Sequence, residues 1–236
     1  MSEVRQVMLD TETTGLEWRQ GDRVIEIGCV ELRNRKLTGQ RFHRYLNQER
    51  TIAAGAQAVH GLTDEFLADK PKFAEIADEL LEFLNGAEVI IHNAPFDIGF
   101  LDYELSLIDR APLKSACDAI TDTLKMARDL RPGKKNSLDA LCSEFGVDNS
   151  GRQLHGALLD AELLAEVYLA MTRGQESLMM DLDSSAAAIA FIKGEHPPIR
   201  VLAAAAEELA EHERVLAEID NESKGKTLWR QLAPNG

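Results

Sequence analysis

The chain has 236 residues, of which 44% are hydrophobic and 28% charged, and its formal net charge is −14. This composition is that of a soluble globular protein, and no run of about 18 apolar residues is present to form a membrane-spanning helix. The negative charge argues against tight autonomous binding to nucleic acid, which normally needs a Lys/Arg-rich surface, unless bound cations supply positive charge at the site.

The first ten residues, MSEVRQVMLD, lack a basic segment followed by an apolar stretch, so no export signal is expected and the protein is expected to be cytoplasmic. Three β-rich stretches follow one another along the first 47 residues, separated by turn-forming glycines and by an Asn-Arg-Lys link. They cover residues 4–13, 23–33 and 37–46. This pattern predicts a β-meander.

After Phe73 the pattern becomes helical and then alternates. We predict a helix over 73–84, a buried strand over 88–92, a helix opened by Pro95, and helices over 121–130, 137–145 and 156–171. Strands first, followed by strand and helix alternation, predict an α/β domain with a mixed sheet flanked by helices.

From Thr172 onward the sequence is polar and aperiodic as far as the His-Pro-Pro breaker at 196–198. Beyond it, apolar positions recur at spacings of three and four and predict an amphipathic helix that ends near Gly225: Leu202, Ala205, Leu209, His212, Leu216 and Ile219. We therefore expect a catalytic domain over 1–173, a flexible linker over 174–200 and a docking tail over 201–236. A lone tail cannot bury such a stripe, so a partner is expected.

Asp10 and Glu12 lie two residues apart on the first predicted strand, so both carboxylates leave the same face of an otherwise apolar segment. Two acids on one face of a buried strand need a cation. By itself the pair fits solvated acids at a strand end equally well.

The helical acids strengthen the cation hypothesis. Asp97 shares a helical stripe with Leu101 and Leu105, and Asp160 shares one with Leu164 and Val167. An unpaired buried carboxylate is costly, and we find no matching set of Lys or Arg on these faces. Four oxygen donors favour Mg²⁺ or Mn²⁺ over zinc, which prefers His and Cys ligands.

His155 lies five residues before Asp160, a spacing that separates the two by roughly 140° if both are helical. We therefore expect His155 just outside the helix, ahead of Gly156. There its imidazole, with an unperturbed pKa of about 6.5, suits a general base for a water molecule. A lone His at this place is otherwise an ordinary surface or capping residue.

These segments resemble a known family. DTETTG with Asp10 and Glu12, HNAPFD with Asp97, and HGALLDA with His155 and Asp160 look like the three motifs of the DEDDh exonucleases, in the same order. HGLTDE and PGKKNSLDALC look specifically like the epsilon-type proofreading exonucleases of bacterial DNA polymerase III. The resemblance covers about residues 4–172.

The resemblance implies an RNase H-like fold and 3′→5′ excision from a DNA 3′ end, with release of nucleoside 5′-monophosphates. It implies two catalytic cations, Mg²⁺ or Mn²⁺, bridged by Asp10 and completed by Glu12, Asp97 and Asp160, with His155 as the base. It further implies that His60 and Asn93 position the substrate strand, and that Glu12, Thr13 and Gly15 contact the terminal nucleotide. Proofreading during replication is thus the predicted function.

The C-terminal part carries two further resemblances. QESLMM, with Gln175, Leu178 and Met180, resembles the peptide with which such subunits touch the sliding clamp, except that Met180 stands where an aromatic is expected. An ordinary polar linker explains the segment as well. The helix with Leu209 and Leu216, together with Trp229, resembles the tail that binds the polymerase catalytic subunit, while a helix packed on its own domain is the alternative.

Two other functions remain open at this point. An exoribonuclease of the same class, such as ribonuclease T or oligoribonuclease, would share the motifs, but such enzymes are essentially the nuclease domain without a tail. A non-catalytic adaptor between clamp and polymerase would not need the acids and His155, which are all present.

Overall fold

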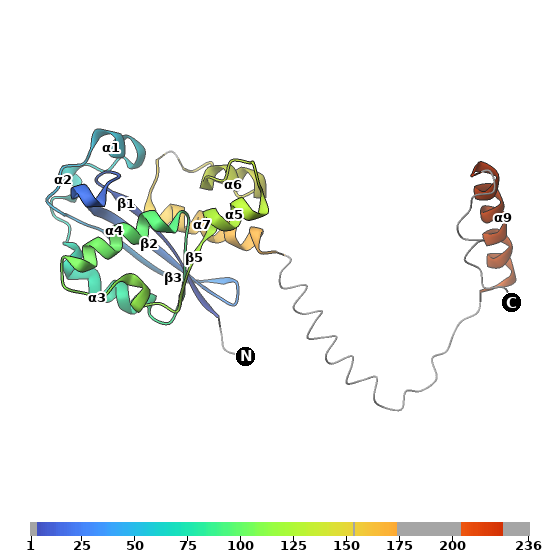
Figure 1. Cartoon of the computed structure of the whole chain (residues 1–236), viewed down its shortest axis with the longest axis horizontal. Helices are drawn as coiled ribbons and strands as arrows, with labels where there is room; N and C mark the ends of the chain where they lie inside the picture. Colours follow the sequence, from blue (N-terminus) through green and yellow to red (C-terminus); the bar gives the residue numbers. More distant parts are fainter. Residues whose placement is uncertain (1–3, 153, 174–203, 224–236) are drawn as a thin grey trace, which may run out of the picture. The chain divides into compact units, whose positions relative to one another are not determined.

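The computed structural model describes residues 4–152, 154–173 and 204–223. These fall into two units: a layered α/β unit, within residues 1–179, whose described part ends at residue 173, and a second unit, within residues 180–236, of which the helix α9 is described (Figure 1). The predicted linker over 174–200 lies outside the described residues. Within the described part, no helix has the length and apolar character needed to cross a bilayer.

A five-stranded mixed sheet forms the centre of the first unit, in the order β3-β2-β1-β4-β5. The strands are β1 (Arg5–Thr13), β2 (Val24–Arg33), β3 (Lys36–Tyr45), β4 (Glu88–Ile91) and β5 (Ala119–Asp122). β1, β2 and β3 are antiparallel neighbours, whereas β4 runs parallel to both β1 and β5. The predicted meander and mixed sheet are confirmed.

Helices cover both faces of this sheet (Figure 1). The structure has α1 (Ala54–His60), α2 (Asp64–Leu67), α3 (Phe73–Leu84), α4 (Ala94–Ser106), α5 (Thr123–Leu130), α6 (Leu138–Phe145) and α7 (Ala157–Met171). Short 3-10 turns lie at η1 (Trp18–Gln20) and η2 (Leu113–Ser115).

The side chains of β1 alternate between two cores, as strand geometry requires. Val7 and Leu9 pack with α3 and α4, whereas Met8 packs with α6 and α7. Asp10 and Glu12 continue the even-numbered series, so they leave the sheet on the face that α7 covers. The strand thereby delivers both acids to the same side as Asp160.

The sequence prediction was wrong around residue 121, where it began a helix two residues early. Thr121 and Asp122 belong to β5, and α5 begins at Thr123. Asp122 caps that helix, because its Oδ1 accepts hydrogen bonds from the Leu124 and Lys125 N–H groups at 2.9 and 3.3 Å. The side chains of β5 are only partly buried, so this strand lacks the apolar run by which β4 was recognised. The helices α1 and α2, of seven and four residues, were missed because they are too short for a helical period to be recognised.

The helix α9 spans Ala206–Glu222, within the range predicted for the amphipathic tail helix. Its first turn is capped by Glu208, whose Oε2 accepts from the Ala205 N–H at 2.8 Å. Leu209 and Ile219 are 55% and 45% exposed, and Leu216 is half-buried. Within the described residues this apolar stripe is thus mostly open to solvent.

Candidate active site

A cleft of about 800 Å³ opens at the end of β1, between the sheet and the α5–α6 segment. All five residues that we predicted for catalysis line it, from three separate parts of the chain: Asp10 and Glu12 from β1, Asp97 from α4, and, near the start of α7, His155 just before the helix and Asp160 in its first turn. The fold therefore brings together residues that are up to 150 positions apart in the sequence.

Asp97 is held in the first turn of α4. Asn93 precedes this helix in the left-handed conformation, with φ of 68°, and Pro95 follows inside the first turn. The Thr11 hydroxyl, on the opposite face of β1 from Asp10, donates a hydrogen bond to Asp97 Oδ1 at 2.7 Å. The strand thus supplies two acids on one face and orients a third from the other face.

Gly28 sets the position of α7. It lies opposite Asp10 in the β1–β2 pairing. A Cβ atom there would stand 2.2 Å from the Leu158 nitrogen and 2.3 Å from the Ala157 carbonyl carbon, so only glycine lets the helix start lie directly on the sheet. Asp160, in the first turn, is thereby brought beside Asp10. The isolated glycine in the apolar run VIEIGCVEL was the signal that the sequence prediction overlooked.

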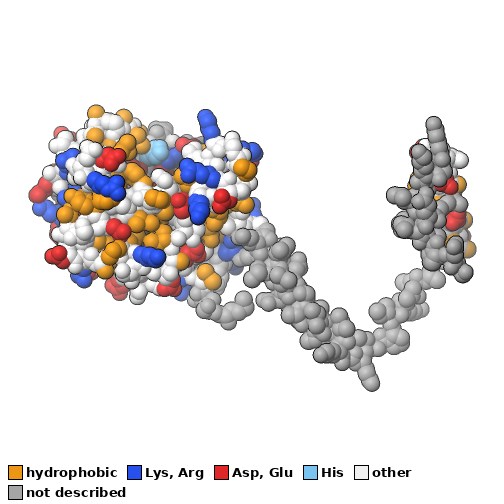
Figure 2. Space-filling model, viewed as in Figure 1, with side chains coloured by type: hydrophobic (Ala, Val, Ile, Leu, Met, Phe, Trp, Pro, Cys, Tyr) orange, Lys and Arg blue, Asp and Glu red, His pale blue; other side chains and the backbone are white. Residues whose placement is uncertain are grey.

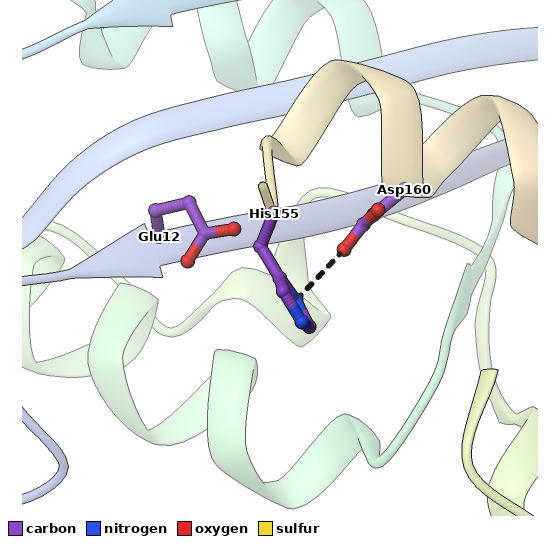
Figure 3. Close-up of side chains that lie close together, drawn as sticks. All are labelled: Glu12, His155 and Asp160. Atoms are coloured by element: carbon purple, nitrogen blue, oxygen red, sulfur yellow. Dashed lines mark ion pairs between the residues drawn. The ribbon is translucent and has the colours of Figure 1, made fainter. Parts of the chain in front are cut away.

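His155 lies outside α7, ahead of the N-cap Gly156, as predicted. Its backbone N–H donates to the Val59 carbonyl at 3.1 Å, which ties the segment to α1. Its Nδ1 lies 3.3 Å from Asp160 Oδ2, and Figure 3 shows the ring beside both carboxylates. Glu12, His155 and Asp160 each offer a ligand atom within 4.8 Å of the others, so this trio could contact a metal ion.

The clustered acids hold protons more tightly than usual. Burial raises the pKa of Asp10 well above its ordinary value, and the neighbouring carboxylates raise it further. Burial, followed by the charge of Asp160, raises the pKa of Glu12 to about 8. Burial likewise raises the pKa of Asp97 to about 7, although the hydrogen bond from Thr11 opposes it. The site therefore has an excess of negative charge, which either protons or cations can offset.

The expectation that no Lys or Arg matches these acids was wrong. Arg152, whose side chain is 6% exposed, makes two hydrogen bonds to Asp160: Nε to Oδ1 at 2.6 Å and Nη2 to Oδ2 at 2.5 Å. Asp139 and the ring of His155 are its other partners. Arg152 lies in the loop before α7, and helical spacing compares only residues within one helix, so the prediction could not include it.

Of the residues predicted to contact the substrate, the structure places some in the lining of the cleft and others outside it. Asn93 is exposed and lines the cleft. His60 is buried, with Nδ1 accepting from the Leu62 N–H at 3.0 Å and Nε2 without a hydrogen-bond partner in the described structure. The Thr13 hydroxyl donates to the Gly15 carbonyl at 2.6 Å. Thr13, Gly15 and His60 are not among the residues that line the cleft.

Basic side chains gather over the region of α5 and α6 (Figure 2). Arg128 and Lys134 line the cleft there. Lys134 is paired with Glu144 at 3.0 Å, whereas Arg128 forms no ion pair with another described residue. Leu16 and Phe96 add an apolar contribution to the lining. The net charge of the chain did not reveal these basic side chains at the cleft, because acidic residues outnumber basic ones in the whole sequence.

Comparisons with known proteins agree with this arrangement. A family model described as an exonuclease matches residues 7–168. DNA polymerase III subunit epsilon of Escherichia coli K12 is 49% identical, covering 96% of this chain and 97% of the relative. The subunit of the same name from Rickettsia felis is 56% identical, covering 78% of this chain and 81% of the relative.

The chain belongs to the exonuclease family, among the epsilon subunits of DNA polymerase III. As a member it is a 3′→5′ exonuclease and a proofreading subunit. The structure of exonuclease X in complex with 5′ overhanging duplex DNA is 26% identical with a TM-score of 0.56, over 71% of this chain and 91% of that one. An E. coli exonuclease I–ssDNA complex, at 16% identity and a TM-score of 0.66 over 78% of this chain and 43% of that one, shares the fold.

Divalent metal use follows from membership in this family. The residues present fit such ions, because the donors are carboxylate oxygens that converge from β1, α4 and α7 in a cleft open to solvent. The raised pKa values of Asp10, Glu12 and Asp97 support the same conclusion, since they show a local excess of negative charge.

Proposed function

We propose that this epsilon-family exonuclease removes the terminal nucleotide from a single-stranded or mispaired DNA 3′ end by hydrolysis and releases a nucleoside 5′-monophosphate. The observation that carries the proposal is the convergence of four carboxylates and one imidazole in a single cleft. The cytoplasm, where replication takes place in bacteria, is the proposed location.

Asp10, Glu12, Asp97 and Asp160 are the residues proposed to hold two divalent cations, Mg²⁺ or Mn²⁺. When bound, the cations would stabilise the charge that develops on the phosphate and help to activate water. Asp97 is kept in position by the hydroxyl of Thr11, and Asp160 by the close packing of α7 on Gly28.

His155 is proposed to accept the proton of the attacking water at Nδ1, the ring nitrogen that faces Asp160. The backbone hydrogen bond to Val59 holds the histidine at the cleft without fixing it in a helix. An exposed imidazole is able to exchange that proton with solvent after each cycle.

The walls of the cleft suit a single strand. Arg128 and Lys134 on one wall are suited to phosphates, and the apolar Leu16 and Phe96 are suited to a base. Asn93 is proposed to contact the strand directly. Glu12, Thr13 and Gly15 are proposed to contact the terminal nucleotide, and His60 is proposed to help position the strand. A mispaired end frays at lower cost than a paired one and is therefore selected before hydrolysis.

A primer assay tests this proposal. The full chain should remove a 3′-mispaired nucleotide from DNA faster than a paired one, and faster than the end of a matched RNA strand. EDTA should abolish excision, and excess Mg²⁺ or Mn²⁺ should restore it, with EDTA already saturated by Mg²⁺ as the control. Faster removal from RNA than from DNA would instead support the exoribonuclease alternative.

We also propose that the chain is divided into a nuclease domain (1–173), a linker (174–200) and a docking tail (201–236). The exposed stripe of α9, with Leu209 and Leu216, supports a contact with the polymerase catalytic subunit. Trp229, and the clamp-binding residues Gln175, Leu178 and Met180, lie outside the described residues. The clamp contact is proposed from the sequence resemblance alone.

A shortened chain that ends at Arg173 tests the division. It should degrade short single-stranded DNA at about the rate of the full chain but should fail to co-purify with the polymerase catalytic subunit. In the full chain, Leu209→Asp or Trp229→Ala should weaken the association by about 2 kcal/mol, because a charge enters, or an aromatic leaves, an apolar contact. Glu207→Ala, on the same helix, is the matched control and should bind normally.

If the shortened chain loses activity because it unfolds, the tail is part of the nuclease core and the docking assignment has to be withdrawn.

A further inference from the structure

Arg152 is nearly enclosed by three partners at the cleft. Its guanidinium makes the two hydrogen bonds to Asp160 described above, donates from Nη1 to Asp139 Oδ1 at 2.5 Å, and approaches His155 Nδ1 from Nη2 at 2.7 Å. The side chain is 6% exposed, and that of Asp160 is 5% exposed. Such a fork-shaped contact to both oxygens of a buried carboxylate is among the strongest that a protein can form.

This contact conflicts with cation binding at Asp160. Both carboxylate oxygens already accept hydrogen bonds from the guanidinium. A divalent cation at those oxygens would face a positive charge at close range, and the two side chains that carry the pair are themselves nearly buried. The guanidinium and a cation on Asp160 are therefore alternatives.

We propose that Arg152 is an internal counter-ion of the active site, which holds Asp160 until a divalent cation displaces it and which thereby sets the affinity of the site for that cation. The inference rests on the proposed role of Asp160 as a cation ligand. Arg152 acts through Asp160 and His155 and is thus a positioning residue.

Asp139 gives the displaced guanidinium a second attachment. It lies in the first turn of α6, 57% exposed, and bonds Nη1, the guanidinium nitrogen that does not bond Asp160. Releasing Asp160 therefore leaves the Arg152–Asp139 pair able to persist. Displacement then needs a change of side-chain conformation in Arg152 rather than unfolding of the loop.

His155 is affected by the same contact. A guanidinium has no acceptor atom, so Nδ1 of His155 must accept the hydrogen bond from Arg152, and the neutral ring then carries its proton on Nε2. In that state Nδ1 cannot take a proton from water. The same Nη2 group bonds both Asp160 and His155, so a movement of that group away from Asp160 would also change its contact with His155.

Direct titration of the full chain with Mn²⁺, followed by the electron paramagnetic resonance signal of free Mn²⁺, tests the inference. Arg152→Gln should lower the dissociation constant about tenfold, equivalent to about 1.4 kcal/mol. Arg152→Lys keeps the charge but loses the two-point contact, so its dissociation constant for Mn²⁺ should lie between those of the wild type and of Arg152→Gln. Arg110→Gln removes an arginine paired with Asp78 away from the cleft, and this matched control should change the constant less than twofold.

Thermal unfolding gives a second readout. In EDTA, Arg152→Gln should unfold at a lower temperature than the wild type, because Asp160 loses its counter-ion. Mn²⁺ should raise its unfolding temperature by more than it raises that of the wild type, since tighter binding to the folded state stabilises it more. If Arg152→Gln does not fold in EDTA, Arg152→Lys carries the test alone.

The outcomes separate this inference from the proposed function. An unchanged or weaker Mn²⁺ affinity in the folded Arg152 variants overturns the counter-ion role. Asp160→Asn should weaken Mn²⁺ binding whatever Arg152 does. If Asp160→Asn binds Mn²⁺ like the wild type, Asp160 is not a cation ligand, and that part of the proposed function fails.

Discussion

Asp10→Ala should lower the rate of excision by about 10³-fold or more while leaving the fold intact. A cation contribution of about 4 kcal/mol to the transition state corresponds to a rate factor of that size. Asp129→Ala, which removes an exposed carboxylate from α5, is the matched control and should excise at the wild-type rate. The measurement is single-turnover removal of a 3′ nucleotide, with circular dichroism to verify folding. Near wild-type excision by Asp10→Ala would remove this residue from the site.

The same cluster predicts an unusual pH dependence for the protein in EDTA. The folded-state pKa of Glu12 is about 8, above its ordinary value of 4.5, so the folded state binds more protons than the unfolded state between these values. The stabilisation from this proton is complete below about pH 4.5. It is lost as the pH rises through 8. Glu12→Gln should therefore flatten the fall in unfolding temperature between pH 5 and 8, whereas Asp129→Ala should not.

Asp160 is expected to differ from Asp10 in how its replacement by alanine changes the stability of the protein in EDTA. Because Arg152 neutralises Asp160, Asp160→Ala leaves a nearly buried guanidinium with a weaker set of partners. The Asp10→Ala protein in EDTA should thus be more stable than the wild type, and the Asp160→Ala protein less stable. The sequence alone suggested a cluster of four unpaired acids. In such a cluster, both replacements would have changed the stability in the same direction.

The acids themselves could be found from the sequence because each lies in a regular element. Asp10 and Glu12 follow the two-residue period of a strand, and Asp97 and Asp160 follow the apolar stripes of helices whose other members are buried. His155 could be placed outside α7 because five residues do not match a helical turn. Local periodicity thus indicated the four acids, and a departure from it indicated His155.

Other parts of the site depend on contacts that no local period encodes. Gly28 matters because α7, about 130 residues later, lies on it. Arg152 matters because its loop folds back onto Asp160 and Asp139. The anchoring of His155 to Val59 depends on α1, a helix of seven residues that has no clear pattern of its own. These contacts arise from tertiary packing, so one sequence read locally does not reveal them.

His155→Ala should lower the maximal rate of excision by about 10² to 10⁴-fold, the usual range for loss of a general base. Two roles are compatible with its geometry. Its Nδ1 lies 3.3 Å from Asp160, which suits proton transfer, and its ligand atom also falls within 4.8 Å of those of Glu12 and Asp160, which suits metal ligation. The maximal rate alone does not distinguish these roles, since His155→Ala would be slow whether His155 is a base or a metal ligand.

The affinity for Mn²⁺ does distinguish them. A base outside the cation shell can be removed with only a small change in the Mn²⁺ dissociation constant, whereas loss of a ligand should weaken binding by tenfold or more. We expect the small change, because His155 is exposed and outside α7, while the carboxylates of Asp10, Asp97 and Asp160 remain in place. His212→Ala, an exposed histidine on α9, serves as the control for both measurements and should alter neither. A collapse of Mn²⁺ affinity in His155→Ala would make His155 a metal ligand, and the proton would then have to be accepted by another group.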